Sequence, residues 1–255
     1  MRIFFLLVDE PFYTPACLEP LLDRWGRSVA GAAFPKGFFD WKRVRTSIAL
    51  YGVAGTAARS ARVALAALRG GAVHRRLAAK GIPTIEVDNV NAQGFLDELR
   101  RLSVDVIVSL NCPQRLKREI LSLPSHGCLN VHFGLLPRYR GILPIFYALL
   151  NGESSFGVTV HFMDDKLDNG DILVQREVAI LPGDDLETSY PEAFAVAAEL
   201  LSEAFEALER GAIGRRPNRE SDKTYYSYPT KQMIKTYRQL VRSRAEFKTV
   251  RSVRL

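Results

Sequence analysis

The feature that most constrains the fold is a series of short, predominantly apolar runs, each followed by a helical pattern. Ile3–Val8 and Val104–Leu110 are two such runs, and helical periodicity follows them over residues 15–25 and 115–123. Near-continuous apolar runs of this length are typical of parallel strands that are covered on both faces. Strand–helix alternation therefore predicts an α/β chain with a Rossmann-like, doubly wound, mainly parallel sheet and right-handed crossovers.

The remaining pattern completes this organisation. Further strands are expected at Val29–Phe34, Ile82–Val87, Cys128–His132 and Ile172–Leu181, with helices at Ala92–Leu102 and Leu186–Arg210. Residues 36–81 are longer than one crossover needs, which predicts a helical insertion of two helices. We therefore expect one large unit over residues 1–210 and a short C-terminal extension over residues 211–255.

The turn after the first strand reads DEPFYTP and contains neither GxGxxG nor GxxxxGK[ST]. Without a glycine cradle for a pyrophosphate, a dinucleotide cofactor at this turn is not expected. Ligands of open α/β sheets nevertheless bind outside the carboxyl ends of the strands. The loops after Val8, Leu110 and His132 are therefore the candidate site.

The net charge of +7 is unevenly distributed. Residues 211–255 carry twelve Lys or Arg and three Asp or Glu, and Trp41–Ile85 carries nine basic residues and no acidic one. This asymmetry favours an anionic partner such as a phosphate, nucleotide, nucleic acid or lipid headgroup, although two solvated faces would give the same counts. Within the insertion, Ser47–Leu68 is either a surface helix pair that contacts an anionic ligand or membrane, or a helical hairpin packed on the sheet.

The cysteines and the apolar segments restrict the class of protein. Cys17, Cys112 and Cys128 form an odd set without CxxC spacing, which argues against a disulfide framework and a zinc site, so no metal is expected. The first apolar run ends at Asp9 and is too short for a signal-peptide core, and Ser47–Ala58 is too short to span a bilayer. We therefore expect a cytoplasmic protein.

The densest functional pattern is GCLNVHFGLLPRYRG over residues 127–141. Asn130 and His132 lie two residues apart on a predicted strand, so their side chains point to the same face at its carboxyl end. Asn supplies a neutral hydrogen-bond donor, and His can exchange a proton near neutral pH. Asp168 follows in a polar loop that also holds Asp164 and Asp165.

Taken together, these segments resemble the folate-dependent formyltransferase family. The matching residues are Asn130–His132, Leu135–Gly141, Gly157–His161 and Leu167–Ile172, in the family's order and spacing. The resemblance implies the formyltransferase fold, 10-formyltetrahydrofolate as formyl donor, and a catalytic domain over residues 1–210. It also implies that Asn130, His132 and Asp168 are the catalytic trio, and that an amine attacks the formyl carbon.

The resemblance assigns further roles by position. Backbone and side chains that hold the pteridine ring are expected at Ser109, Leu110, Asn111, Cys112, Pro113, Met163, Asp164 and Asp165. Acceptor contacts are expected from Phe12, Tyr139, Arg140 and Gly141. Thr159 and His161 are interpreted either as supports of the trio or as an ordinary strand pair in the core.

Departures from the family pattern restrict the acceptor. Phe133–Gly134 replaces the small residue and Ser that many relatives carry, which alters the local hydrogen bonding. DEPFYTP lacks the phosphate loop of the glycinamide ribonucleotide enzyme, and the forty-five residues after Arg210 are too few for the β-barrel of the methionyl-tRNA enzyme. We therefore expect a small phosphorylated amine as the acceptor, most simply an amino sugar on a nucleotide or lipid carrier.

Several alternatives stay open at this point. Hydrolysis of 10-formyltetrahydrofolate is one, although relatives with that activity carry a regulatory domain before the catalytic one. A methionyl-tRNA formyltransferase-like enzyme and a non-catalytic nucleic-acid-binding protein are others. The tyrosines and basic residues of 223–244 would suit nucleic acid, a nucleotide-sugar or simple packing. Nucleic acid is disfavoured as a partner, while peripheral membrane contact and a homodimer through the C-terminal region remain possible partnerships.

Overall fold

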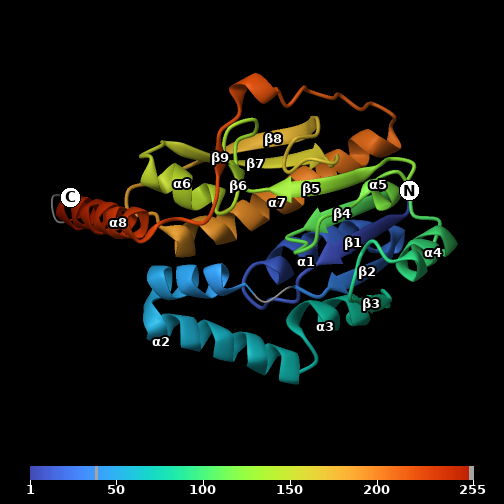
Figure 1. Cartoon of the computed structure of the whole chain (residues 1–255), viewed down its shortest axis with the longest axis horizontal. Coiled ribbons are helices and arrows are strands. Elements are labelled where there is room, and N and C mark those ends of the chain that lie inside the picture. The colour runs from blue at the N-terminus through green and yellow to red at the C-terminus, as the bar shows by residue number, and fades with distance from the viewer. Residues whose placement is uncertain (38–39, 253–255) are drawn as a thin grey trace.

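The computed structural model describes residues 1–37 and 40–252. Its centre is a seven-stranded sheet in the order β3-β2-β1-β4-β5-β7-β8 (Figure 1). The first five strands in that order are parallel neighbours, whereas β7 pairs antiparallel with β5 and β8. The strands are β1 Ile3–Leu7, β2 Val29–Pro35, β3 Thr84–Val87, β4 Val106–Leu110, β5 Cys128–His132, β7 Ser155–Phe162 and β8 Ile172–Ala179.

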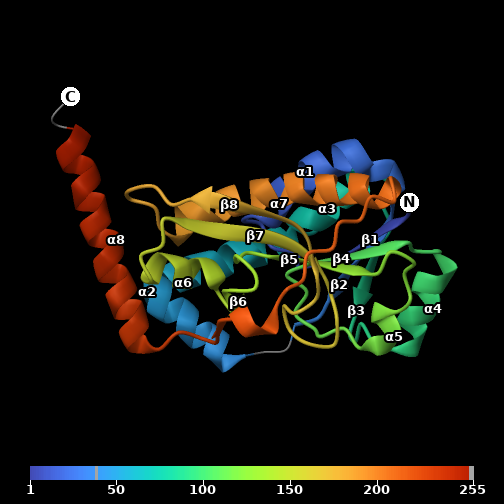
Figure 2. The same cartoon turned by 90° about the horizontal axis from the view of Figure 1, so that it is seen from above.

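Helices cover both faces of the sheet (Figure 2). One core contains Ile3, Phe5 and Leu7 of β1 and packs against α1 Thr14–Trp25, α3 Ala72–Ala79 and α7 Leu186–Glu209. The other contains Phe4 and Leu6 and packs against α4 Gln93–Arg101 and α5 Arg118–Leu121. Alternate β1 side chains thus enter opposite cores, which explains why this strand is apolar throughout. The predicted doubly wound, mainly parallel α/β fold is confirmed.

The insertion contains two helices, as expected, but its first helix does not pack on the sheet. It contains α2 Trp41–Leu68 and α3, and α2 is divided by a kink at Gly52, whose φ of 74° lies in the left-handed region. Only Thr46 is buried along α2, so the interpretation of Ser47–Leu68 as a hairpin packed on the sheet is wrong. The reason is its composition: apart from the cavity wall, α2 has no apolar face matched to a sheet surface.

The C-terminal extension packs back on the main unit. Tyr225–Tyr226 forms β9, which pairs with β6 Arg140–Gly141, and Lys231–Ser252 forms α8. α8 lies against α2 and against α6 Pro144–Leu150, a helix that the sequence pattern did not reveal. Within the described part of the chain, no helix is long and apolar enough to cross a membrane.

Candidate active site

The three loops singled out from the sequence meet around one cavity of about 900 Å³. Val8 and Phe12 follow β1, Asn111 follows β4, and Asn130 and His132 come from the end of β5. β1 and β4 are adjacent although they are not consecutive among the strands, so the chain reverses direction across the sheet at this point. A switch of this kind leaves a crevice at the carboxyl ends of the strands, where ligands of open α/β sheets bind.

His132 is held by the loop that follows its own strand. The side chain is 6% exposed, and its Nε2 lies 2.7 Å from the carbonyl oxygen of Tyr139. A carbonyl oxygen only accepts, so Nε2 carries a proton and donates it. The other ring nitrogen, Nδ1, lies 3.6 Å from Oδ1 of Asp168. An imidazolium at His132 would therefore carry its second N–H on the side of this carboxylate, at a separation too long for a direct hydrogen bond.

Asp168 owes its position to a left-handed backbone and two anchors. Its φ is 49°, a conformation that Asp and Asn adopt more readily than other side chains. Oδ2 accepts a hydrogen bond of 2.8 Å from the backbone N–H of Gly141, and the carbonyl oxygen accepts one of 2.9 Å from Asn218. The remaining oxygen, Oδ1, faces His132 and lies 4.0 Å from Nε2 of His161. The predicted trio thus converges from two segments of the chain.

Asn130 is oriented by His161. β5 and β7 pair in a register that sets Asn130 opposite His161 and His132 opposite Thr159. Nδ1 of His161 donates to the carbonyl oxygen of Phe162 at 2.8 Å, so its Nε2 presents a lone pair. The side-chain amide of Asn130 donates to that lone pair at 3.2 Å. The amide of Asn130 is thereby fixed with its nitrogen toward His161, and the same nitrogen carries a second hydrogen.

Burial keeps His161 neutral. Removal from water, together with the nearby charge of His132, lowers the pKa of His161 to about 4. Neutral His161 can accept the hydrogen bond from Asn130, whereas the protonated ring could not. This placement favours the interpretation of His161 as a support of the trio, and its burial in the β5–β7 pair shows that it also belongs to the core.

Replacing His161 by glutamine should reduce the acid sensitivity of the fold. Between the ordinary pKa of 6.5 and about 4, the unfolded chain binds a proton that the native protein rejects, so stability is lost as the pH falls through this window. The loss attributable to His161 is up to about 3 kcal/mol. Urea unfolding at about pH 7 and about pH 5 measures it, and equal losses in wild type and His161→Gln would contradict a neutral, buried His161.

Thr159 ties the same strand to the loop after His132. Its hydroxyl donates to the carbonyl oxygen of Gly134 at 2.7 Å and accepts from Gln175 at 2.7 Å. Gly134 has no room for a side chain, because an added Cβ would lie 2.7 Å from Nε2 of His132. The departure at Phe133–Gly134 is therefore accommodated by Thr159 and a close backbone approach, while Phe133 stacks on Phe194 at 4.6 Å.

The eight residues predicted to hold the pteridine ring separate into two groups. Asn111 and Cys112 line the cavity, and Asn111 has a left-handed φ of 63°. Ser109 and Leu110 are buried in β4, and Pro113 is exposed. Met163 packs against the α4 core, while Asp164 accepts hydrogen bonds from Lys166 and Asn169 within its loop. The role of the whole set stays a prediction.

The four residues predicted to contact the acceptor also separate. Phe12 and Gly141 line the cavity. Arg140 is buried and points away from it, with its guanidinium hydrogen-bonded to Asn169, Asn218 and Glu220. The side chain of Tyr139 donates to Glu153 and stacks on Tyr226, again outside the cavity wall. The polar groups of Arg140 and Tyr139 instead hold the loop in place, and a contact of either residue with the acceptor stays a prediction.

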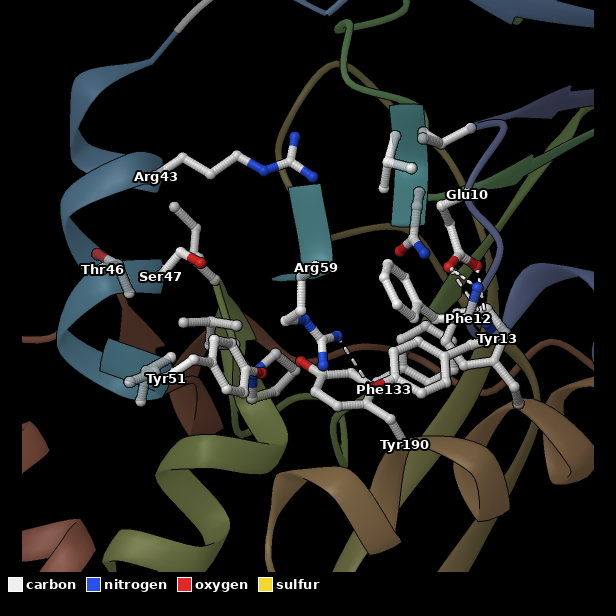
Figure 3. Close-up of a pocket in the computed structure, with 18 of the residues that line it drawn as sticks. Glu10, Phe12, Tyr13, Arg43, Thr46, Ser47, Tyr51, Arg59, Phe133 and Tyr190 are labelled. Atoms are coloured by element: carbon white, nitrogen blue, oxygen red, sulfur yellow. Dashed lines mark hydrogen bonds between the residues drawn. The ribbon is translucent and has the colours of Figure 1, made fainter. Parts of the chain in front are cut away.

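In the turn DEPFYTP, the carboxylate of Glu10 occupies the N-terminus of α1. The carboxylate of Glu10 accepts hydrogen bonds from the backbone N–H groups of Phe12, Tyr13 and Thr14 at the start of α1 (Figure 3). These donors are the ones that a phosphate would use at a helix N-terminus. A fixed carboxylate there repels a second anion, which agrees with the expectation that this turn binds no phosphate.

The wall opposite the strand ends comes from residues that the sequence did not single out. Arg43, Thr46, Ser47, Tyr51 and Arg59 of α2 face the cavity together with Tyr190 of α7 (Figure 3). Arg59 is held in place, because it donates to the hydroxyl of Tyr13 at 3.2 Å and its guanidinium lies over the rings of Phe12 and Tyr51. In the sequence, only the absence of acidic residues from Trp41–Ile85 indicated that this segment could contact an anionic ligand.

The C-terminal extension closes the same cavity. Tyr228 lies in its lining and hydrogen-bonds Asp40, the N-cap residue of α2. Among the described residues, no group of three or more His, Cys, Asp or Glu side chains could hold a metal ion. The cavity therefore combines one polar corner, formed by Asn130 and His132, with a wall of tyrosines and arginines.

Comparison with known proteins identifies the family. Residues 56–205, which include the trio, match the family model described as formyl transferase. The chain belongs to this formyl transferase family. Methionyl-tRNA formyltransferase of Caldanaerobacter subterraneus is 40% identical over 155 residues, which are 60% of this chain and 50% of that protein. The chain thus matches about half the length of its curated relatives.

Solved structures of the family share the fold. Glycinamide ribonucleotide transformylase 1 of Symbiobacterium toebii superimposes with a TM-score of 0.62 at 22% identity, covering 86% of this chain and 93% of that one. The formyltransferase PseJ of Anoxybacillus kamchatkensis gives 0.50 at 25% identity over 61% of this chain and 79% of its own. Its structure contains a UDP-linked 4-formamido sugar and tetrahydrofolate.

Proposed function

We propose that this chain transfers the formyl group of 10-formyltetrahydrofolate to the primary amine of a small phosphorylated acceptor. Residues 1–210 would form the catalytic domain, with 36–81 as an insertion and 211–255 as an extension that supplies Tyr228. The observation that carries the proposal is the convergence of the trio: Asn130 and His132 line the cavity, and Asp168 lies behind the wall with its Oδ1 3.6 Å from Nδ1 of His132. Membership of the formyl transferase family supports the same reaction.

The trio suits the bonds that must form and break. Attack of an amine on the formyl carbon forms a C–N bond and a tetrahedral oxyanion, and an ammonium that must lose a proton. The second amide hydrogen of Asn130 and the Nδ1–H of protonated His132 donate to the oxyanion. One such preorganised donor contributes about 3–4 kcal/mol. Collapse of the intermediate expels the folate nitrogen, which takes up a proton.

Asp168 serves the proton transfer. Its Oδ1 lies 3.6 Å from Nδ1 of His132, which is longer than a direct hydrogen bond, so both atoms can contact the same water or reactant atom beside them. The carboxylate stabilises the imidazolium and accepts the proton of the attacking amine directly or through water. Gly141 holds its other oxygen, so the reacting oxygen keeps one direction.

The cavity wall supports an amino sugar on a nucleotide or lipid carrier as the acceptor. Arg43 supplies positive charge, Arg59 supplies a guanidinium that is paired with Glu187 at 2.6 Å, and Phe12, Tyr51 and Tyr190 supply flat apolar faces. Guanidinium groups pair with phosphates, and aromatic rings pack against sugars and bases. The UDP-linked sugar in the PseJ structure is consistent with this acceptor class.

Methionyl-tRNA is the second candidate acceptor. The sequence relatives at 36–40% identity are methionyl-tRNA formyltransferases. The surface around the cavity is basic on α2, which would also suit a nucleic-acid backbone. The acceptor therefore has to be tested with both classes.

Calorimetry with 5-formyltetrahydrofolate, a stable analogue of the donor, tests the folate site. Wild type and His132→Ala should bind it with comparable affinity, because the ring of His132 is reserved for chemistry. Turnover of 10-formyltetrahydrofolate with a UDP-linked amino sugar should be lost in the variant and retained in wild type. Absence of binding to wild type would contradict the donor, whereas binding with turnover only on methionyl-tRNA would overturn the acceptor.

A further inference from the structure

Among the described residues, α2 carries more of the exposed large apolar side chains than any other element, and all of these except Val63 lie outside the cavity lining. Ten large apolar side chains are exposed among the described residues, and six belong to this helix. They are Trp41, Ile48, Val53, Val63, Leu65 and Leu68. Isolated exposed apolar residues are ordinary, but a concentration on one element marks an interaction surface.

Helical spacing separates this outward face from the cavity wall. After the kink, residues 54, 58, 61, 65 and 68 recur every three or four positions and are all exposed, with Leu68 85% exposed. Thr56, Arg59 and Ser60 line the cavity from the other side of the same helix. Figure 1 shows α2 at the edge of the molecule, outside the layers that cover the sheet. One face of α2 therefore serves the cavity and the other faces outward.

The charged residues within α2 are all positive, although Arg59 is paired with Glu187 of α7 at 2.6 Å. Lys42, Arg43, Arg45, Arg59 and Arg62 are the charged residues of Trp41–Leu68, and Arg69 follows directly. α8 adds Lys231, Lys235, Arg238 and Arg242, all exposed, and Arg238 donates to the carbonyl oxygen of Leu50 in α2 at 3.2 Å. The two helices thus form one surface, called the α2–α8 surface below, that joins exposed apolar groups with positive charge.

We propose that the α2–α8 surface binds the face of an anionic lipid bilayer, with α2 lying in the headgroup region. Exposed leucines interleaved with arginines are the pattern of helices that lie in such an interface. A second copy of the chain would bring two positive faces together. A nucleic acid would pair with the arginines, but it offers no apolar partner for Leu65, Leu68 and Ile48.

Docking in this orientation would place the cavity beside the lipid headgroups, since α2 forms both the docking face and one cavity wall. An amine on a lipid-linked phosphate could then enter the cavity from the bilayer. This consequence rests on the proposed transfer reaction, whereas binding to vesicles does not depend on it. Failure of the two ideas is therefore distinguishable: vesicle binding tests the surface, and turnover of a soluble UDP-linked amino sugar tests the chemistry.

Flotation with vesicles tests the surface. The full chain should bind vesicles of phosphatidylcholine mixed with phosphatidylglycerol, and it should bind phosphatidylcholine alone at least tenfold more weakly. Leu68→Glu should weaken binding to the anionic vesicles about tenfold or more, because it removes apolar contact and adds a repelled charge. Its matched control is Leu181→Glu, at another exposed leucine in the loop before α7, which should bind as wild type does.

The charge contribution is measured separately. Arg45→Gln combined with Arg69→Gln should weaken binding about tenfold or more, since each basic residue near an anionic surface contributes roughly fivefold. Lys117→Gln combined with Arg118→Gln removes the same charge from α5 and its flank and should have little effect. Circular dichroism confirms that each variant is folded.

Three results would overturn the proposal. Equal binding to neutral and anionic vesicles would remove the role of charge. Retention of full vesicle binding by both α2 variants would place the contact elsewhere. Absence of vesicle binding together with salt-sensitive RNA binding, or a dimer that Leu68→Glu dissociates, would assign the surface to a nucleic acid or to a second copy.

Discussion

Replacing Asp168 by asparagine should lower kcat for formyl transfer by about 100- to 10,000-fold, the range expected when a positioned general base is lost. Asparagine keeps the shape of the side chain, tolerates the left-handed φ of 49°, and can still accept the hydrogen bond from Gly141. It removes the negative charge that faces His132 at 3.6 Å and replaces that accepting oxygen by an amide NH2 group. The fold should therefore survive, with a change in the free energy of unfolding of about 0.5 kcal/mol or less.

Steady-state kinetics with 10-formyltetrahydrofolate and a UDP-linked amino sugar measure this effect. The binding of 5-formyltetrahydrofolate, followed by calorimetry, should stay near the wild-type value, because Asp168 does not line the main cavity. Asp171→Asn is the matched control, since it removes the same charge three residues further along the chain. A variant with near wild-type kcat would show that proton transfer does not pass through Asp168.

Adding one methyl group at Gly134 should displace His132 and lower the activity. The Cβ of Gly134→Ala would lie 2.7 Å from Nε2 of His132, 2.8 Å from the carbonyl oxygen of Tyr139 and 2.9 Å from Cβ of Pro144. Contacts this short force the loop or the imidazole to move, and the hydrogen bond that fixes Nε2 is lost. We expect a fall in kcat of about 100-fold, the effect of a misplacement of roughly 1 Å, and a loss of about 1–3 kcal/mol in stability.

Gly214→Ala is the control for this substitution, because no atom lies within 4 Å of its added Cβ. It should leave both kcat and the urea midpoint close to wild type. The urea midpoint separates misplacement from simple destabilisation, since a displaced imidazole lowers kcat in a protein that is still folded. Full activity in Gly134→Ala would mean that the loop can move without disturbing His132.

These predictions concern a corner of the site whose main residues could be recognised from the sequence. Asn130 and His132 lie on one strand, and the strict alternation of a strand sets both on the same face at its carboxyl end. The apolar runs around β1 and β4 predicted buried parallel strands for an equally local reason. Such features need only the covalent geometry of one segment, so a sequence pattern is sufficient to reveal them.

Other properties depended on contacts between distant segments. Asn218 and Glu220, about eighty residues away, accept the hydrogen bonds of Arg140 and turn it from the cavity. His161 had two equally supported interpretations until the β5–β7 register set it beside Asn130. The periodicity of a sequence predicts which face of an element is buried, but it does not predict the hydrogen-bond partner of a polar side chain.

The insertion shows most clearly which properties follow from the sequence and which follow from the tertiary structure. Its helical character and its lack of acidic residues were determined by the sequence alone, since both are properties of the segment itself. Its position was decided only by the tertiary structure: the kink at Gly52 and the contact with α8 turn one face of α2 into the cavity and leave the other outward. An amphipathic segment specifies which of its faces is apolar, but the surrounding chain decides what each face meets.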